Sequence, residues 1–191
     1  ADIRLGESVA VLGAGPVGQS AIALSALSGA GDVIAVGDPA SRLEFAARMG
    51  ATATFGLDIP PAERTDAIRR LTRGHGVDVV IEASGSPAAV SQALDLVRDG
   101  GRVVICEHYT DNGPVEIHPH WQVNRRHVEI RGCWGCDYSH FHRAVGLAAR
   151  FGDRVPWRAM IGGRYRLADA GGALAAVEQR AVTKAVIVPN A

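Results

Sequence analysis

Three glycines placed between two apolar runs constrain the fold of this chain more than any other feature. Gly13, Gly15 and Gly18 have the spacing G-x-G-x-x-G and follow directly after an apolar run at residues 9–12. A run of this length is typical of a buried strand in a parallel sheet. Apolar positions then recur at helical spacing before a second apolar run at residues 33–36. This order predicts a strand, a helix and a second strand parallel to the first.

Each glycine has a physical role if a dinucleotide binds at this turn. Gly13 permits a tight turn out of the strand, Gly15 lets the backbone approach a pyrophosphate, and Gly18 allows close packing of helix and sheet. Pro16 suits the first turn of the following helix, whose N-terminal N–H groups attract phosphates. Asp38 lies twenty residues after Gly18, where a carboxylate commonly accepts hydrogen bonds from a ribose. The segment therefore predicts a nucleotide-binding site.

A second strand–helix–strand unit follows the first. The expected strands lie at residues 9–12, 33–36, 51–55, 77–83, 102–106 and 127–133. Strands that alternate with helices are typical of doubly wound folds, so we predict an α/β, Rossmann-type, doubly wound six-stranded parallel sheet with helices on both faces. Ligands bind at the carboxyl ends of such strands. The residues expected beside the same crevice are Ala83, Ser84, Gly85, Cys106 and Glu107.

The predicted sixth strand, residues 127–133, follows an irregular stretch at residues 108–124 that includes a short extended piece at 114–117. Val128 and Ile130 alternate with charged residues, a pattern suited to a sheet with unlike faces. As the last strand it leaves a sheet edge, and edges must be covered or paired. We therefore expect a homodimer or tetramer formed through this strand.

The chain ends in a mixed helix and strand region. Its expected elements are a helix at 139–151 capped by Asp137 or Ser139, a helix at 167–180 and a strand at 184–188. We assign residues 1–150 to the nucleotide-binding domain. Residues 151–191 form a C-terminal segment of helix and strand.

Composition excludes several classes of function. Apolar residues make up 47% of the 191 residues, which is enough for a sizeable core. The 20 basic and 20 acidic residues balance, so binding to nucleic acid or to a membrane surface through bulk charge is disfavoured. No apolar stretch reaches the length of a membrane span or resembles a signal peptide. Three cysteines are too few for a disulfide framework and favour the reducing cytoplasm.

Three other groups of residues suggest sharper chemistry, and we weigh each against a structural role. Cys133 and Cys136 form a C-x-x-C pair, but no second pair completes a zinc site, so we interpret them as incidental thiols. Glu82 and Glu107 end strands without a partner acid or nucleophile, so neither is assigned a catalytic role. Metal binding by histidines would require convergence that spacing cannot establish, so we interpret them as loop residues: His118, His120, His127, His140 and His142.

The ordered segments GESVAVLGAGPVG, VIAVGDPASRLEFAARMGA, VDVVIEASG, DGGRVVI and TKAVIVPN together resemble one family. They are similar to the cofactor-binding, C-terminal half of zinc-dependent medium-chain dehydrogenases, the alcohol, polyol and threonine dehydrogenase group. The resemblance covers nearly the whole chain. In that family a separate N-terminal domain carries the catalytic zinc, its ligands and most of the substrate pocket. The chain starts at Ala1, so we expect that an upstream part is missing.

The resemblance implies a role for each matching position. Pyrophosphate contacts are implied at Gly15, Pro16, Val17 and Gly18, together with the turn at Gly13. Recognition of the adenine ribose is implied at Asp38 and Arg42. The nicotinamide is implied to lie against Ser84, Gly85, Cys106 and Glu107, and Lys184 to lie near the pyrophosphate. One position departs from the pattern, because Gly37 stands where many members carry the ribose acid and Asp38 follows it.

These residues predict the NAD(H)-binding portion of an oxidoreductase that transfers hydride between an alcohol or polyol and nicotinamide. We expect NAD as cofactor, zinc only in the N-terminal domain, and no turnover by this chain alone. The alternative is a stand-alone module or subunit that binds or senses NAD(H) without catalysis. An in-frame upstream zinc domain would favour the enzyme, and a native start codon at Ala1 would favour the module.

Overall fold

The computed structural model describes residues 1–190. Its contacts divide the chain into two compact units, Ala1–Gly135 and Cys136–Ala191. The division lies within the range that the sequence assigns to the first domain, residues 1–150. That assignment of domains stays a prediction, and the two units are described separately below.

The first unit contains a parallel sheet that confirms the predicted fold class. Within residues 1–190 its six strands have the order β3-β2-β1-β4-β5-β6, and every neighbouring pair is parallel. The strands are β1 (Ser8–Leu12), β2 (Asp32–Gly37), β3 (Ala53–Gly56), β4 (Val77–Glu82), β5 (Val97–Ile105) and β6 (Glu129–Gly132). The order reverses between β1 and β4, the point where doubly wound folds bind ligands. As predicted, β6 is the last strand on its edge.

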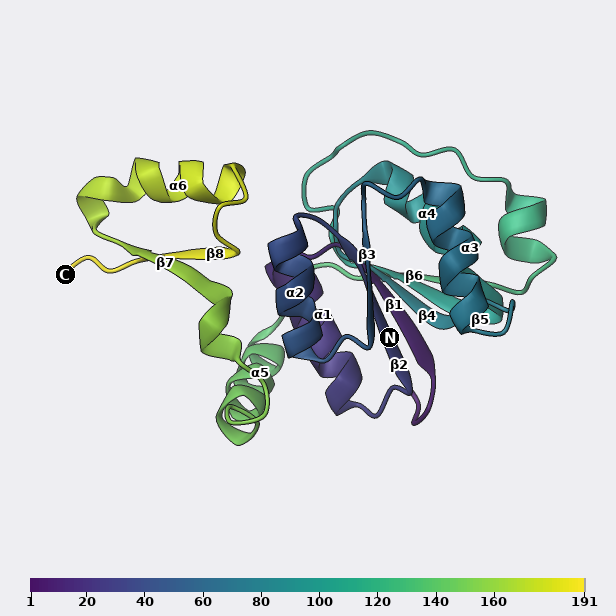
Figure 1. Ribbon diagram of the computed structural model, residues 1–191, viewed down its shortest axis with the longest axis horizontal. Helices are drawn as coiled ribbons and strands as arrows, with labels where there is room; N and C mark the ends of the chain where they lie inside the picture. Colours follow the sequence, from purple (N-terminus) through teal and green to yellow (C-terminus); the bar gives the residue numbers. More distant parts are fainter. Residues whose placement is uncertain (191) are drawn as a thin grey trace. The chain divides into compact units, whose positions relative to one another are not determined.

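Helices join the strands and cover the sheet (Figure 1). They are α1 (Pro16–Leu27), α2 (Ala40–Met49), α3 (Pro61–Leu71) and α4 (Pro87–Leu96). Prolines begin α1, α3 and α4, where a missing N–H costs no hydrogen bond. Gly50 ends α2 in the left-handed conformation at φ 114°, as a C-terminal glycine commonly does.

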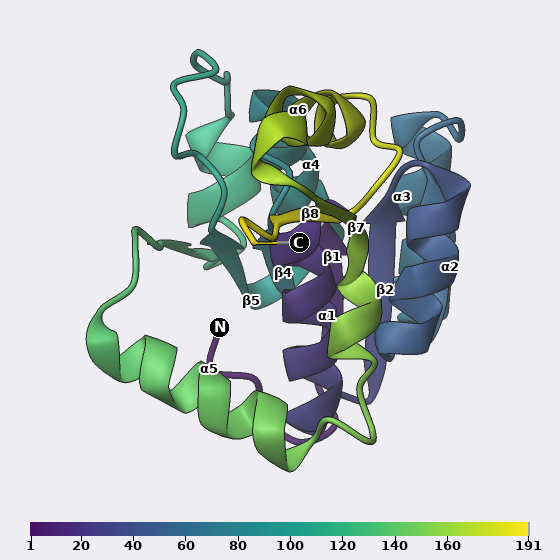
Figure 2. The ribbon, with the colours of Figure 1, turned by 90° about the vertical axis from the view of Figure 1, so that its left-hand side faces the viewer.

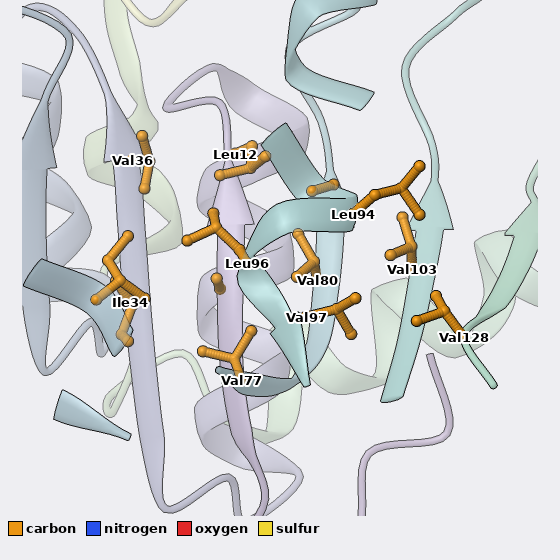
Figure 3. Packing of buried hydrophobic residues seen from close by; sticks show 13 residues of the cluster. Leu12, Ile34, Val36, Val77, Val80, Leu94, Leu96, Val97, Val103 and Val128 are labelled. Atoms are coloured by element: carbon orange, nitrogen blue, oxygen red, sulfur yellow. The ribbon is translucent and has the colours of Figure 1, made fainter. Parts of the chain in front are cut away.

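The hydrophobic core lies between the sheet and the pair α3 and α4 (Figure 3). Alternate positions of the strands point to this side, so Leu12, Ile34 and Val80 meet Leu94 of α4 and Ile68 of α3. The intervening strand residues are also buried. Strands buried on both faces require continuous apolar runs, which explains why these segments were recognisable in the sequence.

Two local features differ from the sequence prediction. The strand expected at residues 102–106 begins earlier, because α4 ends at Leu96 and β5 starts at Val97, which pairs with Val77 of β4. A β-branched residue beside an apolar strand is better placed in the ladder than in a last helical turn. Residues 119–124, part of the stretch expected to be irregular, form a short π-helix, η1 (Pro119–Asn124).

The second unit has its own small sheet, visible beside α6 in Figure 2. Strands β7 (Ile161–Tyr165) and β8 (Lys184–Ile187) pair in parallel, and α6 (Ala170–Glu178) connects them. The helix α5 (Tyr138–Arg150) begins at Asp137, whose side chain accepts a hydrogen bond from the His140 N–H at 3.1 Å. This confirms Asp137 as the cap. Two short 3₁₀ helices, η2 (Trp157–Met160) and η3 (Leu167–Asp169), complete the unit.

Within residues 1–190, no helix has both the length and the apolar character that crossing a bilayer requires.

Candidate nucleotide-binding site

The carboxyl ends of the central strands form one continuous edge. At each end the first residue beyond a strand still donates its N–H to the neighbouring strand. The bonds are Gly13 to Val36 (2.8 Å), Ala83 to Leu12 (2.8 Å), Cys106 to Glu82 (2.9 Å) and Cys133 to Ile105 (3.0 Å). The predicted site residues after β1, β4 and β5 therefore leave the sheet at the same level.

The glycine loop after β1 contains two glycines that the packing requires. Gly13 has φ 116°, and a Cβ there would lie 2.4 Å from the carbonyl oxygen of Ala83. A Cβ on Gly18 would lie 1.8 Å from the carbonyl oxygen of Gly13. Real side chains do not approach a backbone this closely, so these positions serve the close packing of α1 against β1 and β4. The close packing at Gly18 and the positive φ at Gly13 suit the packing and turn roles expected for them, while their contact with a dinucleotide stays a prediction.

Gly15 differs from its two neighbours in the motif. A Cβ built on Gly15 meets nothing within 4 Å, so the space above this residue is open. Gly15 is also the N-cap of α1, with no side-chain hydrogen bond to the helix end and no acid in the first turn. Its carbonyl accepts the first helical bond, from the Gln19 N–H at 2.8 Å. The amides of Val17 and Gly18 lie in the turn that lacks helical acceptors, which suits an anion.

The end of β2 has no room for a side chain at residue 37. A Cβ on Gly37 would lie 2.7 Å from the Cβ of Ala14 and 2.9 Å from its backbone nitrogen. No acid fits at residue 37 while the glycine loop passes so close. Asp38 is the first position beyond that contact, and it is partly exposed. Arg42 follows in the first turn of α2.

Gln19 is a site residue that the sequence reasoning missed. Its side chain is fully buried, and its amide nitrogen donates to the carbonyl of Arg42 at 2.8 Å and to that of Ala14 at 3.3 Å. One side chain therefore joins the glycine loop to the start of α2. A buried Gln in an otherwise apolar helix was the available signal, because such a group requires partners.

Glu82 organises the loop after β4. It is fully buried, and its Oε1 accepts hydrogen bonds from the Ser84 N–H (2.7 Å), the Ser84 hydroxyl (2.6 Å) and the Gly85 N–H (3.1 Å). Its other oxygen lies 3.4 Å from Nε2 of His108. Three donors on one oxygen fix the turn that carries Ser84 and Gly85. The sequence reasoning gave Glu82 no catalytic role, and these contacts show a positioning one.

The loops after β4 and β5 pack directly on each other. Gly85 has φ 70°, and a Cβ there would lie 2.6 Å from the carbonyl oxygen of Glu107. Asn112 donates its side-chain N–H to the Gly85 carbonyl at 2.9 Å, a contact that no motif indicated. Burial and the neighbouring Cys133 thiol raise the pKa of Cys106 to about 11, so this thiol is neutral at physiological pH.

The structure thus brings eleven of the twelve predicted cofactor residues to one edge of the first unit. They are Gly13, Gly15, Pro16, Val17, Gly18, Asp38, Arg42, Ser84, Gly85, Cys106 and Glu107. Lys184 is exposed at the start of β8 in the second unit, and its contact with a pyrophosphate stays a prediction. Within the part of the chain that is described, no three His, Cys, Asp or Glu side chains converge as a metal site would require.

Comparison with known proteins finds dehydrogenases among the relatives of this chain. The chain is 34% identical over 186 residues to 5-exo-hydroxycamphor dehydrogenase of Pseudomonas putida, covering 97% of this chain and 51% of that protein. It is 38% identical over 136 residues to NADP-dependent isopropanol dehydrogenase of Thermoanaerobacter brockii, covering 69% and 37%. Among solved structures, an alcohol dehydrogenase from Thermotoga maritima superposes with a TM-score of 0.91 at 28% identity, covering 97% and 51%.

The fold and the glycine loop define a Rossmann-type nucleotide-binding unit. Residues 16–150 match the zinc-binding dehydrogenase family, and the chain belongs to that family. It matches the cofactor-binding half of zinc-dependent alcohol dehydrogenases. The chain spans about half the length of the first of the curated relatives above.

Proposed function

We propose that this chain binds NAD(H) along the carboxyl edge of its sheet, as the cofactor-binding part of an alcohol or polyol dehydrogenase. The observation that carries the proposal is the open space at Gly15, between two glycines where a Cβ cannot fit. A pyrophosphate there would meet the first-turn amides of α1, with the positive end of the helix dipole. The adenine ribose would lie toward Asp38, and the nicotinamide toward Ser84 and Gly85.

We infer a preference for NAD(H) over NADP(H). The Asp38 carboxylate can accept hydrogen bonds from ribose hydroxyls and repels a 2′-phosphate. Two unit charges about 4 Å apart interact by about 4 kcal/mol at an effective dielectric near 20, an upper guide for an exposed site. A third of that value already gives about tenfold discrimination. The alternative is NADP(H), with Arg42 facing the phosphate; one relative is named NADP-dependent and a solved relative from Sinorhizobium meliloti is described as bound to NADP.

Calorimetric titration with both cofactors tests this preference. We expect NAD(H) to bind about tenfold more tightly than NADP(H). Asp38→Ala should narrow that gap. Asp32→Ala is the matched control, because Asp32 is an exposed acid at the opposite end of the same strand and should leave the ratio unchanged. Equal or tighter binding of NADP(H) by the unmodified chain contradicts the preference.

In the proposed reaction the bound nicotinamide accepts or donates a hydride. The residues of this chain bind and orient the ring: Glu82 holds the turn that carries Ser84 and Gly85, and Glu107 packs against that turn. The resemblance places the catalytic zinc and its ligands in a separate N-terminal domain. We expect no NADH above background when this chain alone is incubated with NAD, zinc and a panel of alcohols and polyols.

We also propose that the protein is cytoplasmic, because its few cysteines favour a reducing compartment.

We further propose that two copies associate through β6. The Cys133 N–H donates toward β5, so the N–H groups of Ile130 and Gly132 face the open edge by alternation. Ile130 is itself 40% exposed. Sedimentation should show a dimer. Ile130→Pro removes only an outward N–H and should give a monomer, whereas a monomeric unmodified chain at high concentration contradicts the proposal.

A further inference from the structure

Cys106 and Cys133 occupy neighbouring positions just beyond the ends of β5 and β6. Ile105 pairs with Gly132, so the next residue of each strand is a cysteine in the same register. The ladder continues to this point, because the Cys133 N–H donates to the Ile105 carbonyl at 3.0 Å. Adjacent strands lie about 4.8 Å apart. That separation falls inside the range of about 4.4–6.8 Å between the Cα atoms of disulfide-bonded cysteines.

The two thiols lie on neighbouring strands and differ in their surroundings. Cys133 is exposed, whereas Cys106 is half-buried. This arrangement exposes the Cys133 thiol to a soluble oxidant and places the half-buried Cys106 thiol at the neighbouring position of β5. Cys136, the third cysteine, is exposed and belongs to the second unit.

We propose that Cys106 and Cys133 form a reversible disulfide when a hydroperoxide oxidises Cys133. The Cys133 thiolate attacks the O–O bond, so an S–O bond forms, the O–O bond breaks and hydroxide leaves. The Cys106 thiolate then attacks the Cys133 sulfur, so the S–S bond forms, the S–O bond breaks and a second hydroxide leaves. The two thiol protons neutralise the two hydroxides. With hydrogen peroxide, two thiols therefore give one disulfide and two waters, and a dithiol reductant reverses the change.

The disulfide has a consequence that rests on the proposed function. Cys106 immediately precedes Glu107, whose carbonyl packs against Gly85 at the predicted nicotinamide end of the site. An S–S bond of about 2 Å is shorter than any contact between two unbonded sulfur atoms, so closing it pulls this segment toward β6. We expect the oxidised chain to bind NAD(H) at least threefold more weakly. Because coupling of two binding events is reciprocal, bound NAD(H) should disfavour the disulfide by the same factor.

Closure should depend on pH through Cys106. Its raised pKa of about 11 reflects burial, the neighbouring Cys133 thiol and the Glu82 carboxylate, against the opposing charge of the N-terminal amino group. Only the thiolate attacks, so the rate of the second step should rise about tenfold per pH unit between pH 7 and 9. A slow second step leaves time to trap the sulfenic acid on Cys133 with dimedone.

Peptide mapping after treatment with hydrogen peroxide and alkylation tests the disulfide without reference to any cofactor. We expect a linked peptide pair that contains Cys106 and Cys133, restored to two free thiols by dithiothreitol. Cys136→Ser is the matched control and should keep the link. Cys106→Ser should abolish it and leave dimedone-reactive Cys133. A link between Cys133 and Cys136, or no link at all, overturns the inference.

Titration of NAD(H) on the reduced and the oxidised chain then separates the two proposals. Failure of the reduced chain to bind contradicts the proposed function and leaves the disulfide mapping unaffected. Normal binding by the reduced chain with equal affinity after verified oxidation contradicts only the coupling. The expected result is at least threefold weaker binding after oxidation, recovered after reduction. In the Cys106→Ser variant, peroxide should leave the affinity unchanged.

Discussion

The loops that follow β1 and β4 leave the sheet side by side but are built in opposite ways. Leu12 and Glu82, the last residues of the two strands, are register partners. After Leu12 the chain turns through a glycine-rich segment, and the N-terminus of α1 has no side-chain cap. After Glu82 the turn amides are bound by the carboxylate of the strand itself.

Equivalent positions at the ends of neighbouring strands can therefore serve either to bind a ligand or to support the binding site. The β1 loop has no side-chain cap at the start of α1, which leaves the first helical turn suited to an anion. In the β4 loop the amides of Ser84 and Gly85 are bound by Glu82, so this loop contributes shape. An apolar residue at the end of one strand and a buried acid at the end of its partner are enough to separate these roles.

Replacing Glu82 by leucine, the residue at its register position in β1, should have the largest effect on the difference between the two loops. Glu82→Leu leaves three donors of Ser84 and Gly85 without their acceptor, and hydrogen bonds to charged groups contribute about 1.5–3 kcal/mol each. We expect a loss of about 4 kcal/mol in the free energy of unfolding, measured by urea titration. Glu82→Gln keeps one acceptor oxygen and should lose clearly less. A loss in Glu82→Leu no greater than in Glu82→Gln would contradict the supporting role.

A methyl group on Gly18 tests the packing part of the β1 loop. The new Cβ would overlap the Gly13 carbonyl oxygen at 1.8 Å, so α1 must move away from β1. Overpacking of this kind commonly costs about 1–3 kcal/mol, and we expect the upper end of that range for Gly18→Ala. Urea titration measures the change. A variant as stable as the unmodified chain would show that the helix can shift without penalty.

The same substitution at Gly15 should affect binding and leave folding nearly intact. Its backbone has φ −76°, which alanine adopts, and the methyl group meets nothing within 4 Å. Gly15→Ala should lose no more than about 1 kcal/mol of stability, the modest cost of alanine at an N-cap. NAD(H) affinity should fall about tenfold, because the methyl group occupies the place of the pyrophosphate. Unchanged affinity in calorimetry would remove the main support for the proposed binding mode.

Much of the fold was predictable because strands buried on both faces leave an unmistakable apolar signal. The segments at Val9, Val33 and Val79 were recognisable for that reason. Strand β7 was not, because its sequence Ile-Gly-Gly-Arg-Tyr has neither an apolar run nor clean alternation. The early start of β5 at Val97 depends on pairing with Val77, a contact 20 residues away that local propensity does not contain.

The site was predictable where backbone shape determines it and less so where side chains meet across the fold. Glycine spacing identified the β1 loop, and the strand ends identified Ser84 and Cys106. The partners of Glu82 and the cysteine pair depend on which strands are neighbours and in what register. The reason for Gly37 was equally hidden, because its contact with Ala14 arises only once β2 lies beside the glycine loop.

The buried amide of Gln19 means that substitutions near Asp38 and Arg42 cannot change cofactor binding independently of the glycine loop. Because it joins Ala14 in the glycine loop to Arg42 at the start of α2, the two halves of the proposed adenosine diphosphate site share one support. A redesign that alters residues 38–42 to admit a phosphorylated ribose should also disturb the glycine loop, where we propose that the pyrophosphate binds. The effect of such substitutions should therefore depend on Gln19. A change of cofactor preference should require a change in the backbone around Arg42 as well as a change in charge.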